Sequence, residues 1–368
     1  MAFLHRKATR ALSILLVCTA LIGWYVQLHH KGKENQHAKH SKDETPVISE
    51  DTRPSDVTKS SRSNSAESAK TDKEPVKKID TETKIGQTAK RSATEKHLID
   101  LDNMDPEELF NRTAIVTAIS QNHLRESKGM IGSVQEILPH RKIILYDLGL
   151  TPRGVEEVKR LCNVELRKFN FSKYPPHVSN LFKYAWKPLI IRDMLEEFGV
   201  VFWGDAAARL QKHPGVLFPV LKEQKGFMAI VEQYGSSKML ARTHPKMFGE
   251  LQIDMNKFVK DDGYALCMEG NRLLFANTAL IQTKIIEPWV ECALREHCIA
   301  PEGGVRGINV KGPVKHTHRF DQAALALVTY RNLRGLLHRG NDQSKLFSQV
   351  AGLSRSTKGA EKAKYCKA

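Results

Sequence analysis

Two acidic side chains stand where an α/β protein could use them for chemistry. Asp205 follows the apolar run 200–203 after a single glycine, and a carboxylate at the tip of a buried strand can bind a metal ion or a sugar hydroxyl. Asp321 and Gln322 form a second polar cluster directly before the apolar run 323–330. The structural alternative for each acid is helix capping, with Asp205 capping a helix that begins near Ala206. We expect the two clusters to lie near each other.

Basic and imidazole groups accompany both acids. Arg209 and Arg319 are candidates for binding a diphosphate, because guanidinium groups bind phosphate oxygens in pairs. Alternatively, Arg209 extends its aliphatic stem along a helix toward solvent. His316 or His318 is the candidate metal ligand, and the alternative is a polar surface loop. The His-x-His spacing lacks the cysteine or carboxylate partners at fixed spacing that a zinc site needs.

Alternating strands and helices must position these residues. Ile191, Met194, Leu195 and Phe198 share one helical face, and Gly199 suits the end of that helix. Alternation of this kind predicts an α/β domain with a mostly parallel sheet and helices on both faces. The predicted strands are 114–119, 142–147, 164–169 and 200–203, and the predicted helices are 123–138, one opening at Thr151-Pro152, and 188–198.

The amino-terminal part of the chain predicts a membrane anchor and a stem. The run 11–28 is mostly apolar and close to the roughly 20 residues that cross a bilayer. Basic residues before it indicate a cytosolic amino terminus, while the alternative is a cleaved signal peptide. Both place the remainder in the secretory lumen. The predicted organisation is 1–10 cytosolic tail, 11–28 transmembrane signal anchor, 29–109 disordered stem, 110–340 lumenal domain and 341–368 basic tail.

Charge and cysteine content suggest an anionic partner and an oxidising compartment. The formal net charge is +16 and the pI is about 9.5, which in a lumenal domain favours a nucleotide diphosphate, an acidic glycan or a phospholipid surface over nucleic acid. Four cysteines of the globular part allow three connectivities, of which we predict Cys292 with Cys298. Asn111 and Asn170 open acceptor triplets for N-glycosylation.

Several blocks in order resemble an uncharacterised, nematode-rich family of single-pass lumenal proteins. The resemblance spans about 114–332, and that family resembles the GT-A glycosyltransferases in layout and in its strand-end acid. It implies a single GT-A-like domain, that is, a nucleotide-diphospho-sugar transferase-like fold. The residues that carry it are Tyr174-Pro175, His177-Val178, the run 184–191, Trp203 with Asp205, Cys292-Ala293-Leu294, the run 298–301 and the run 318–322.

A short cytosolic tail, a single anchor and a long polar stem are the layout of many Golgi-resident transferases, so together with the resemblance we expect a Golgi type II membrane protein, or alternatively a secreted or cell-surface one. It would transfer a sugar from a nucleotide-sugar donor to a lumenal glycan or protein. GT-A enzymes commonly hold Mn²⁺ or Mg²⁺ on Asp-x-Asp, and Ala207 replaces the second acid here. The implied roles are donor ribose or metal for Asp205, diphosphate for Arg209 and Arg319, acceptor orientation or base for Asp321 with Gln322, and an auxiliary metal ligand for His316 or His318.

Two alternatives from other classes remain at this point. One is a catalytically inactive relative that binds glycans or partner proteins in the lumen, which Ala207 favours. The other is a surface interaction protein that binds acidic glycans through its basic residues.

Overall fold

The computed structural model describes residues 98–232, 239–260, 267–304, 317–337 and 341–366. All of them belong to the second of two compact units, Lys77–Ala368. Within the described residues no helix is long and apolar enough to span a membrane. The predicted anchor at 11–28 lies outside the described residues, as does most of the predicted stem.

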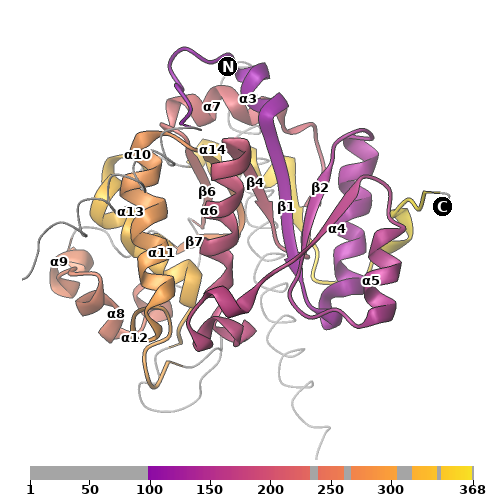
Figure 1. Ribbon diagram of the computed structural model, residues 1–368. Helices are drawn as coiled ribbons and strands as arrows, with labels where there is room; N and C mark the ends of the chain where they lie inside the picture. The colour runs from indigo at the N-terminus through magenta and orange to yellow at the C-terminus, as the bar shows by residue number, and fades with distance from the viewer. Residues whose placement is uncertain (1–97, 233–238, 261–266, 305–316, 338–340, 367–368) are drawn as a thin grey trace, which may run out of the picture. The chain divides into compact units, whose positions relative to one another are not determined.

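A six-stranded sheet in the order β3-β2-β1-β4-β7-β6 forms the centre of the domain (Figure 1). The first four of these strands are parallel, and β7 is antiparallel to both of its neighbours. The prediction of an α/β fold with a mostly parallel sheet is therefore confirmed. The strands are β1 (Thr113–Ile119), β2 (Ile143–Asp147), β3 (Val164–Lys168), β4 (Val200–Gly204), β6 (Phe227–Glu232) and β7 (Cys267–Ala276).

Helices cover both faces of this sheet, as Figure 1 shows. On one face, α4 (Leu124–Ile137) and α5 (Pro152–Lys159) pack on alternate residues of β1 and β2. On the other, α6 (Trp186–Phe198), α11 (Glu287–Leu294) and α13 (Phe320–Leu337) enclose the larger apolar cluster. Both faces of the strands are apolar because both are covered, which is why the runs 114–119 and 200–203 lack polar alternation.

Local signals in the sequence fix where the crossover helices begin and end. Thr151 accepts a hydrogen bond from the Gly154 N–H at 3.1 Å, and Pro152 occupies the first turn of α5. Gly199 ends α6 in the left-handed region at a φ of 77°, where a side chain would be strained. The predicted helices and strands from 114 to 204 are all present, with ends shifted by no more than a few residues.

Shorter elements complete the domain. The remaining helices and strands are α3 (Pro106–Arg112), β5 (Ala208–Leu210), α7 (Phe218–Glu223), α8 (Pro245–Glu250), α9 (Met255–Lys260), α10 (Ala279–Ile281), α12 (Glu296–Ile299), α14 (Asn341–Val350) and β8 (Ala351–Leu353). The 3-10 turns are Gln121–His123, Phe171–Lys173, Pro176–Ser179, Leu181–Lys183, Pro214–Leu217, Met239–Arg242 and Ala360–Lys362, and Gln282–Ile286 is a π-helical turn.

The carboxyl-terminal segment is part of the fold, so the predicted separate basic tail at 341–368 is wrong. Phe347 and Val350 of α14 are fully buried, and β8 pairs antiparallel with β5. Gln135 of α4 accepts a hydrogen bond from the Lys364 N–H at 2.7 Å. The abundance of lysine hid this role, because a few apolar residues at the right spacing are enough to bury one side of a short segment.

The amino-terminal boundary also differs from the prediction. Ile99 and Leu101 are buried, and the Ile99 N–H donates to the Asn277 carbonyl at 2.8 Å. The chain therefore packs on the domain from Ile99 onward, and the predicted stem at 29–109 extends too far.

Two disulfides link cysteines of the described domain. Cys292 pairs with Cys298, which confirms the predicted connection between α11 and α12. Cys162 pairs with Cys366, a bond missed because Cys366 lies in the predicted basic tail and was not counted with the cysteines of the globular part. This second bond joins the end of α5 to the carboxyl-terminal segment across a sequence separation of 204.

Replacing Cys162 and Cys366 together by alanine should destabilise the domain. Closing a loop of 204 residues removes much denatured-state entropy, so we expect a loss of about 3–5 kcal/mol in the free energy of unfolding, measured by urea denaturation. The Cys18→Ala variant, altered outside the described domain, serves as the control. An unchanged free energy of unfolding, or free thiols at both positions in peptide mapping, would contradict the assignment.

Candidate functional site

Asp205 lies at the carboxyl end of β4, at the rim of the sheet. Its backbone N–H donates to the Asn271 carbonyl at 2.9 Å, and its own carbonyl accepts from the Ala208 N–H at 2.8 Å. The chain then turns at Ala206 and Ala207 and continues as β5. No helix begins there, so the interpretation of Asp205 as a helix cap is wrong, and Arg209 belongs to a strand rather than a helix.

The position of Asp205 coincides with a reversal in strand order. The crossovers from β1 to β2 and from β2 to β3 run through α4 and α5 on one face, whereas the crossover to β4 runs through α6 on the other. Chain connections therefore diverge between β1 and β4. In open α/β sheets the crevice beyond the carboxyl ends of such diverging strands is where ligands bind.

A buried lysine joins the two acids that the sequence singled out. Lys187 Nζ lies 3.0 Å from Asp205 Oδ1 and 3.0 Å from Asp321 Oδ2, and it donates to the Gly270 carbonyl at 3.0 Å. Asp205 Oδ1 also accepts from the Trp203 indole N–H at 2.7 Å. The Lys187 side chain is 3% exposed and that of Asp321 is 7% exposed, whereas that of Asp205 is 33% exposed. The triad thus opens to solvent through Asp205.

Charge pairing keeps this buried lysine ionised. Burial alone would lower the pKa of Lys187, but the carboxylates of Asp205 and Asp321 outweigh it and raise that pKa above its usual range. Burial raises the pKa of Asp321, with Lys187 opposing and Asp205 adding to the increase. The ammonium group of Lys187 is thus shared by two carboxyl groups, and of these the carboxyl group of Asp205 reaches the rim.

The second polar cluster is fixed by contacts within the core. Asp321 lies in the first turn of α13, and its carbonyl accepts from the Trp289 indole N–H at 2.9 Å. Gln322 donates to the Met268 carbonyl at 2.6 Å. Gly270 allows this close approach, because a Cβ there would lie 3.3 Å from Asp321 Oδ2 and 3.3 Å from the Gln322 Cβ. Asp321 is therefore positioned to bind Lys187 rather than to meet a substrate.

Lys187 was not singled out from the sequence. It lies in the first turn of α6 among Trp186, Pro188 and Leu189, all of which are buried. A single lysine inside an otherwise apolar helix start is the signal that could have found it, since an unpaired ammonium is rarely buried.

Arg209 has a structural role that does not fit phosphate binding. Its guanidinium donates to the carbonyls of Ala206 and Ala208 at 2.8 Å each, and to those of Glu126 and Ser356 at 3.1 Å each. It therefore ties β5 to α4 and to the carboxyl-terminal segment. Burial lowers the pKa of Arg209 from its usual value.

His318 does not take part in the predicted metal shell. His318 is fully buried, its Nδ1 accepts from the His244 N–H at 3.2 Å, and its Nε2 bonds the Ile299 carbonyl at 3.0 Å. Both ring nitrogens are engaged, so none remains for a metal ion. His316 lies outside the described residues. Arg319 is half-buried, and its backbone N–H donates to the Arg242 carbonyl at 3.0 Å.

The site does not fit the predicted Mn²⁺ or Mg²⁺. Across the described ranges, no three His, Cys, Asp or Glu side chains gather in a group that could hold a metal ion. The carboxylates of Asp205 and Asp321 do converge, but on the ammonium of Lys187. Ala207, in place of a second acid after β4, is itself buried and offers no ligand.

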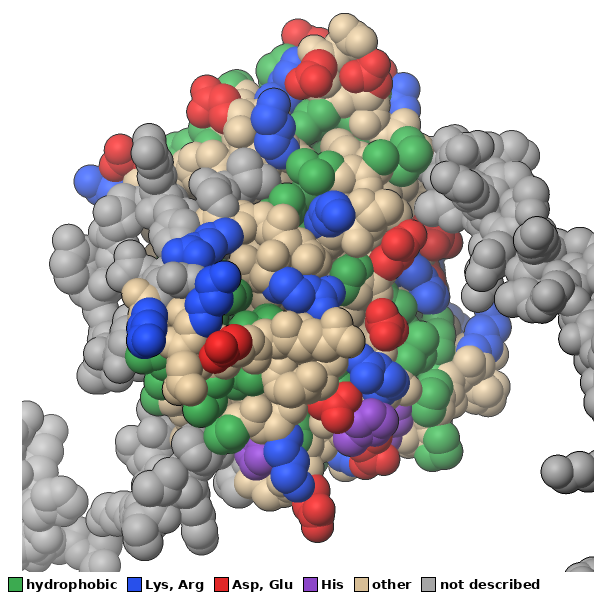
Figure 2. All heavy atoms as spheres, turned by 90° about the vertical axis from the view of Figure 1, so that its left-hand side faces the viewer, with side chains coloured by type: hydrophobic (Ala, Val, Ile, Leu, Met, Phe, Trp, Pro, Cys, Tyr) green, Lys and Arg blue, Asp and Glu red, His purple; other side chains and the backbone are tan. Residues whose placement is uncertain are grey.

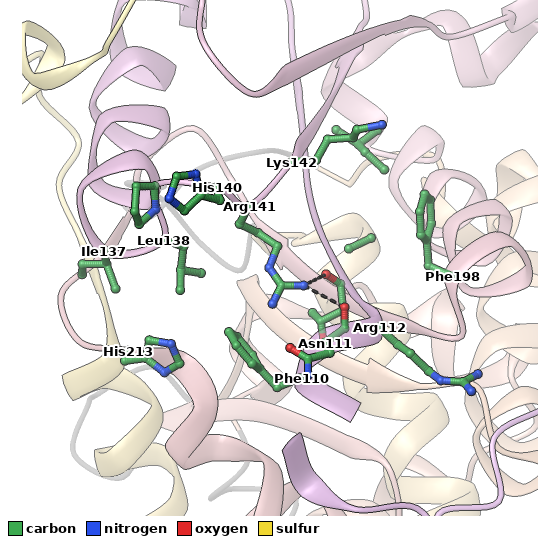
Figure 3. Close-up of a pocket in the computed structure, with 14 residues that line it drawn as sticks. Phe110, Asn111, Arg112, Ile137, Leu138, His140, Arg141, Lys142, Phe198 and His213 are labelled. Carbon is green, nitrogen blue, oxygen red and sulfur yellow. Dashed lines mark hydrogen bonds between the residues drawn. The ribbon is translucent and has the colours of Figure 1, made fainter. Parts of the chain in front are cut away.

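A hollow of about 660 Å³ lies at the opposite edge of the sheet, where β1 and β2 begin (Figure 3). Phe110, His140 and His213 contribute to its lining. Arg141 extends into this hollow in Figure 3, and its guanidinium donates a hydrogen bond to the Asn111 carbonyl at 2.8 Å. Asn111 and Asn170, the two candidates for N-glycosylation, are both exposed. Asn111 lines this hollow, whereas the Asn170 side chain accepts a hydrogen bond from the Ser172 hydroxyl at 2.6 Å. The hollow is separate from Asp205.

The charges on one face of the domain are mixed. Figure 2 shows lysine and arginine side chains spread over this face with acidic side chains between them. Such a face differs from the single-sign patch that strong binding of an acidic polymer needs.

Comparisons with known proteins give a family match and similar folds. A family model described as "Protein of unknown function (DUF1647)" matches residues 84–192, which include Lys187 but neither aspartate of the triad. No curated protein matches the chain.

Similar solved structures are glycosyltransferases. The WbbM bifunctional glycosyltransferase has a TM-score of 0.38 and 12% identity, covering 60% of this chain and 38% of that one. The galactosyltransferase LgtC with donor and acceptor sugar analogues has a TM-score of 0.41 and 10% identity, covering 67% and 92%. Core-mannan synthase A from Aspergillus fumigatus in its Mn/GDP form has a TM-score of 0.37 and 8% identity, covering 63% and 74%.

The buried neutral His318 should make the domain sensitive to acid. Burial lowers the pKa of His318 from 6.5 to about 4, so between these values the unfolded chain binds a proton that the folded one does not. The stability that this neutral histidine contributes is fully present above pH 6.5. As the pH falls toward 4, the free energy of unfolding decreases by up to about 3 kcal/mol. We expect His318→Gln to flatten this slope in urea unfolding at pH 7.5 and 4.5.

The exposed His140 supplies the matched control for that experiment. His140→Gln should keep the pH slope of the unmodified protein, because no described contact buries this ring. If His318→Gln retained the full slope instead, the acid sensitivity would have another origin.

Proposed function

We propose that this protein binds a nucleotide sugar at the rim formed by Asp205 and transfers the sugar to a lumenal glycan or protein. The proposal rests on the position of Asp205. Its carboxylate is partly exposed, one of its oxygens is held in place, and it lies where the strand order reverses. Asp205 Oδ1 is held by Trp203 and Lys187, so the carboxylate has a set orientation. Its exposed part is free to accept hydrogen bonds from ribose or sugar hydroxyls.

The chemistry assigned to each residue follows from its contacts. Asp205 is the group that touches the donor. Lys187 and Asp321 position it, because both are buried behind it. A general-base role for Asp321, proposed from the sequence, does not fit a carboxylate that is bonded to an ammonium and 7% exposed. Arg319 remains the candidate for the diphosphate, since it lies half-buried beside the start of α13.

The proposed location is the Golgi membrane, with a single-pass type II anchor at 11–28. Two disulfides in the described domain support an oxidising compartment, where such bonds persist. Secretion or display at the cell surface is the alternative, and the disulfides are equally compatible with it.

One observation favours a second candidate, a sugar-binding protein without transferase activity. The second polar cluster contains Asp321 and Gln322, and both side chains are already bonded within the protein, Asp321 to Lys187 and Gln322 to the Met268 carbonyl. Binding through Asp205 without transfer would agree with this arrangement.

Thermal shift with UDP- and GDP-sugars tests the proposal. A donor at about 100 times its dissociation constant stabilises the folded state by about 2.7 kcal/mol, which should raise Tm by several degrees. Asp205→Asn should weaken binding at least tenfold, since it removes the acceptor charge. Asp193→Asn, which alters a half-buried acid on α6 that pairs with Arg192, is the matched control and should bind normally.

Release of free nucleoside diphosphate then separates the two candidates. Release from a bound donor in the presence of acceptor supports the transferase, and binding without release supports the second candidate. If no nucleotide sugar shifts Tm, or if Asp205→Asn binds as well as the unmodified protein, the proposed function is wrong.

A further inference from the structure

The ammonium group of Lys187 occupies a position with the donor set of a hard-cation site. Three oxygens surround it: one from the tip of β4, one from the start of α13 and the backbone carbonyl of Gly270 in β7, each 3.0 Å from Nζ. Carboxylate and carbonyl oxygens are the ligands that Mg²⁺, Mn²⁺ and Ca²⁺ prefer. They come from three elements far apart in sequence, as the ligands of a metal site often do.

The ammonium group of Lys187 bonds to all three of these oxygens. An ammonium group has three N–H donors and no acceptor, and the three oxygens match them one to one. The rings of Tyr184, Trp186 and Trp203 also surround Nζ, with centroids at 5.7, 5.9 and 5.6 Å. Aromatic faces attract a desolvated cation, so they add to its retention.

A divalent ion could reach these oxygens only by displacing Lys187. The lysine is covalently part of α6, its side chain is 3% exposed, and its removal would leave the buried carboxylate of Asp321 without a partner. Metal binding and Lys187 therefore compete for the same oxygens, and the lysine has the advantage of being tethered beside them by its own backbone.

We propose that Lys187 is a built-in cation that replaces a divalent metal in this site, so that ligand binding at Asp205 is independent of divalent metal ions. Lys187 fixes the orientation of the Asp205 carboxyl group and places a positive charge against it, as a bound metal ion would do. The nature of the ligand rests on the proposed function, but the replacement of the metal by Lys187 does not, and it can be tested without any sugar.

Titration of the full-length protein with MnCl₂, followed by the electron paramagnetic resonance signal of free Mn²⁺, tests this directly. The unmodified protein and Asp205→Asn should give superimposable curves, because the triad binds no Mn²⁺. Any Mn²⁺ held by the 15 histidines elsewhere in the chain cancels in this comparison. Mn²⁺ binding that is lost in Asp205→Asn would overturn the proposal.

Two variants of Lys187 extend the test. Lys187→Ala removes the ammonium and opens its space, so it should gain Mn²⁺ binding at least tenfold tighter than that of the unmodified protein, and Asp321→Asn in addition should abolish that gain. Lys187→Met removes the charge but fills the space and should gain little. Lys183→Ala, which breaks only the surface pair with Glu296, is the control.

If Lys187→Ala does not fold, the comparison with Asp205→Asn still decides the question. Folded Lys187→Ala that gains no Mn²⁺ site would count against the proposal. Once a nucleotide sugar that binds has been found, its dissociation constant is measured with and without EDTA. We expect the two values to agree within twofold. Absence of any donor refutes only the proposed function, whereas Mn²⁺ binding that depends on Asp205 refutes only the inference.

Discussion

Two carboxylates from distant parts of the chain meet one ammonium group inside this domain, and the arrangement of the candidate site depends on that contact. Lys187 enters from the first turn of α6, Asp205 from the tip of β4 and Asp321 from the first turn of α13. Burying such charges costs several kcal/mol per ion unless they are paired, and removing one partner leaves another stranded. The three residues therefore constrain one another, and with them the relative positions of three elements.

The rest of the fold brings these three residues together. The parallel strands β1 to β4 bring Asp205 to the edge where the chain connections diverge, and the antiparallel β7 supplies Gly270, the third acceptor of Lys187. Gly270 also lets α13 approach closely enough for Asp321 to reach the lysine. Arg209, by contrast, stabilises the neighbouring turn through four backbone carbonyls and holds the carboxyl-terminal segment against it.

Local patterns in the sequence predicted what is local in the structure. Apolar runs, Thr151-Pro152 and Gly199 were sufficient for the first four strands and their helices, and hence for the position of Asp205 at the rim. The pairing of Cys292 with Cys298 was also predictable, because the two are close in sequence. Contacts between distant segments were not. Lys187, His318 and Arg209 received wrong roles or none, since their roles come from carbonyls and carboxylates that only the folded chain brings to them. The Cys162–Cys366 bond was missed for the same reason.

A double-mutant cycle on Lys187 and Asp321 measures the central interaction most directly. The free energies of unfolding of Lys187→Met, Asp321→Asn and the double variant would be compared with that of the unmodified protein. We predict that Lys187→Met costs about 3–5 kcal/mol, because it leaves the buried carboxylate of Asp321 without its cation. Asp321→Asn should cost less, because Lys187 keeps Asp205 as its partner, and the double variant should cost no more than Lys187→Met, because the second change removes the carboxylate already left unpaired. Costs that simply add would mean that the two residues do not depend on each other, and would contradict this description of the site.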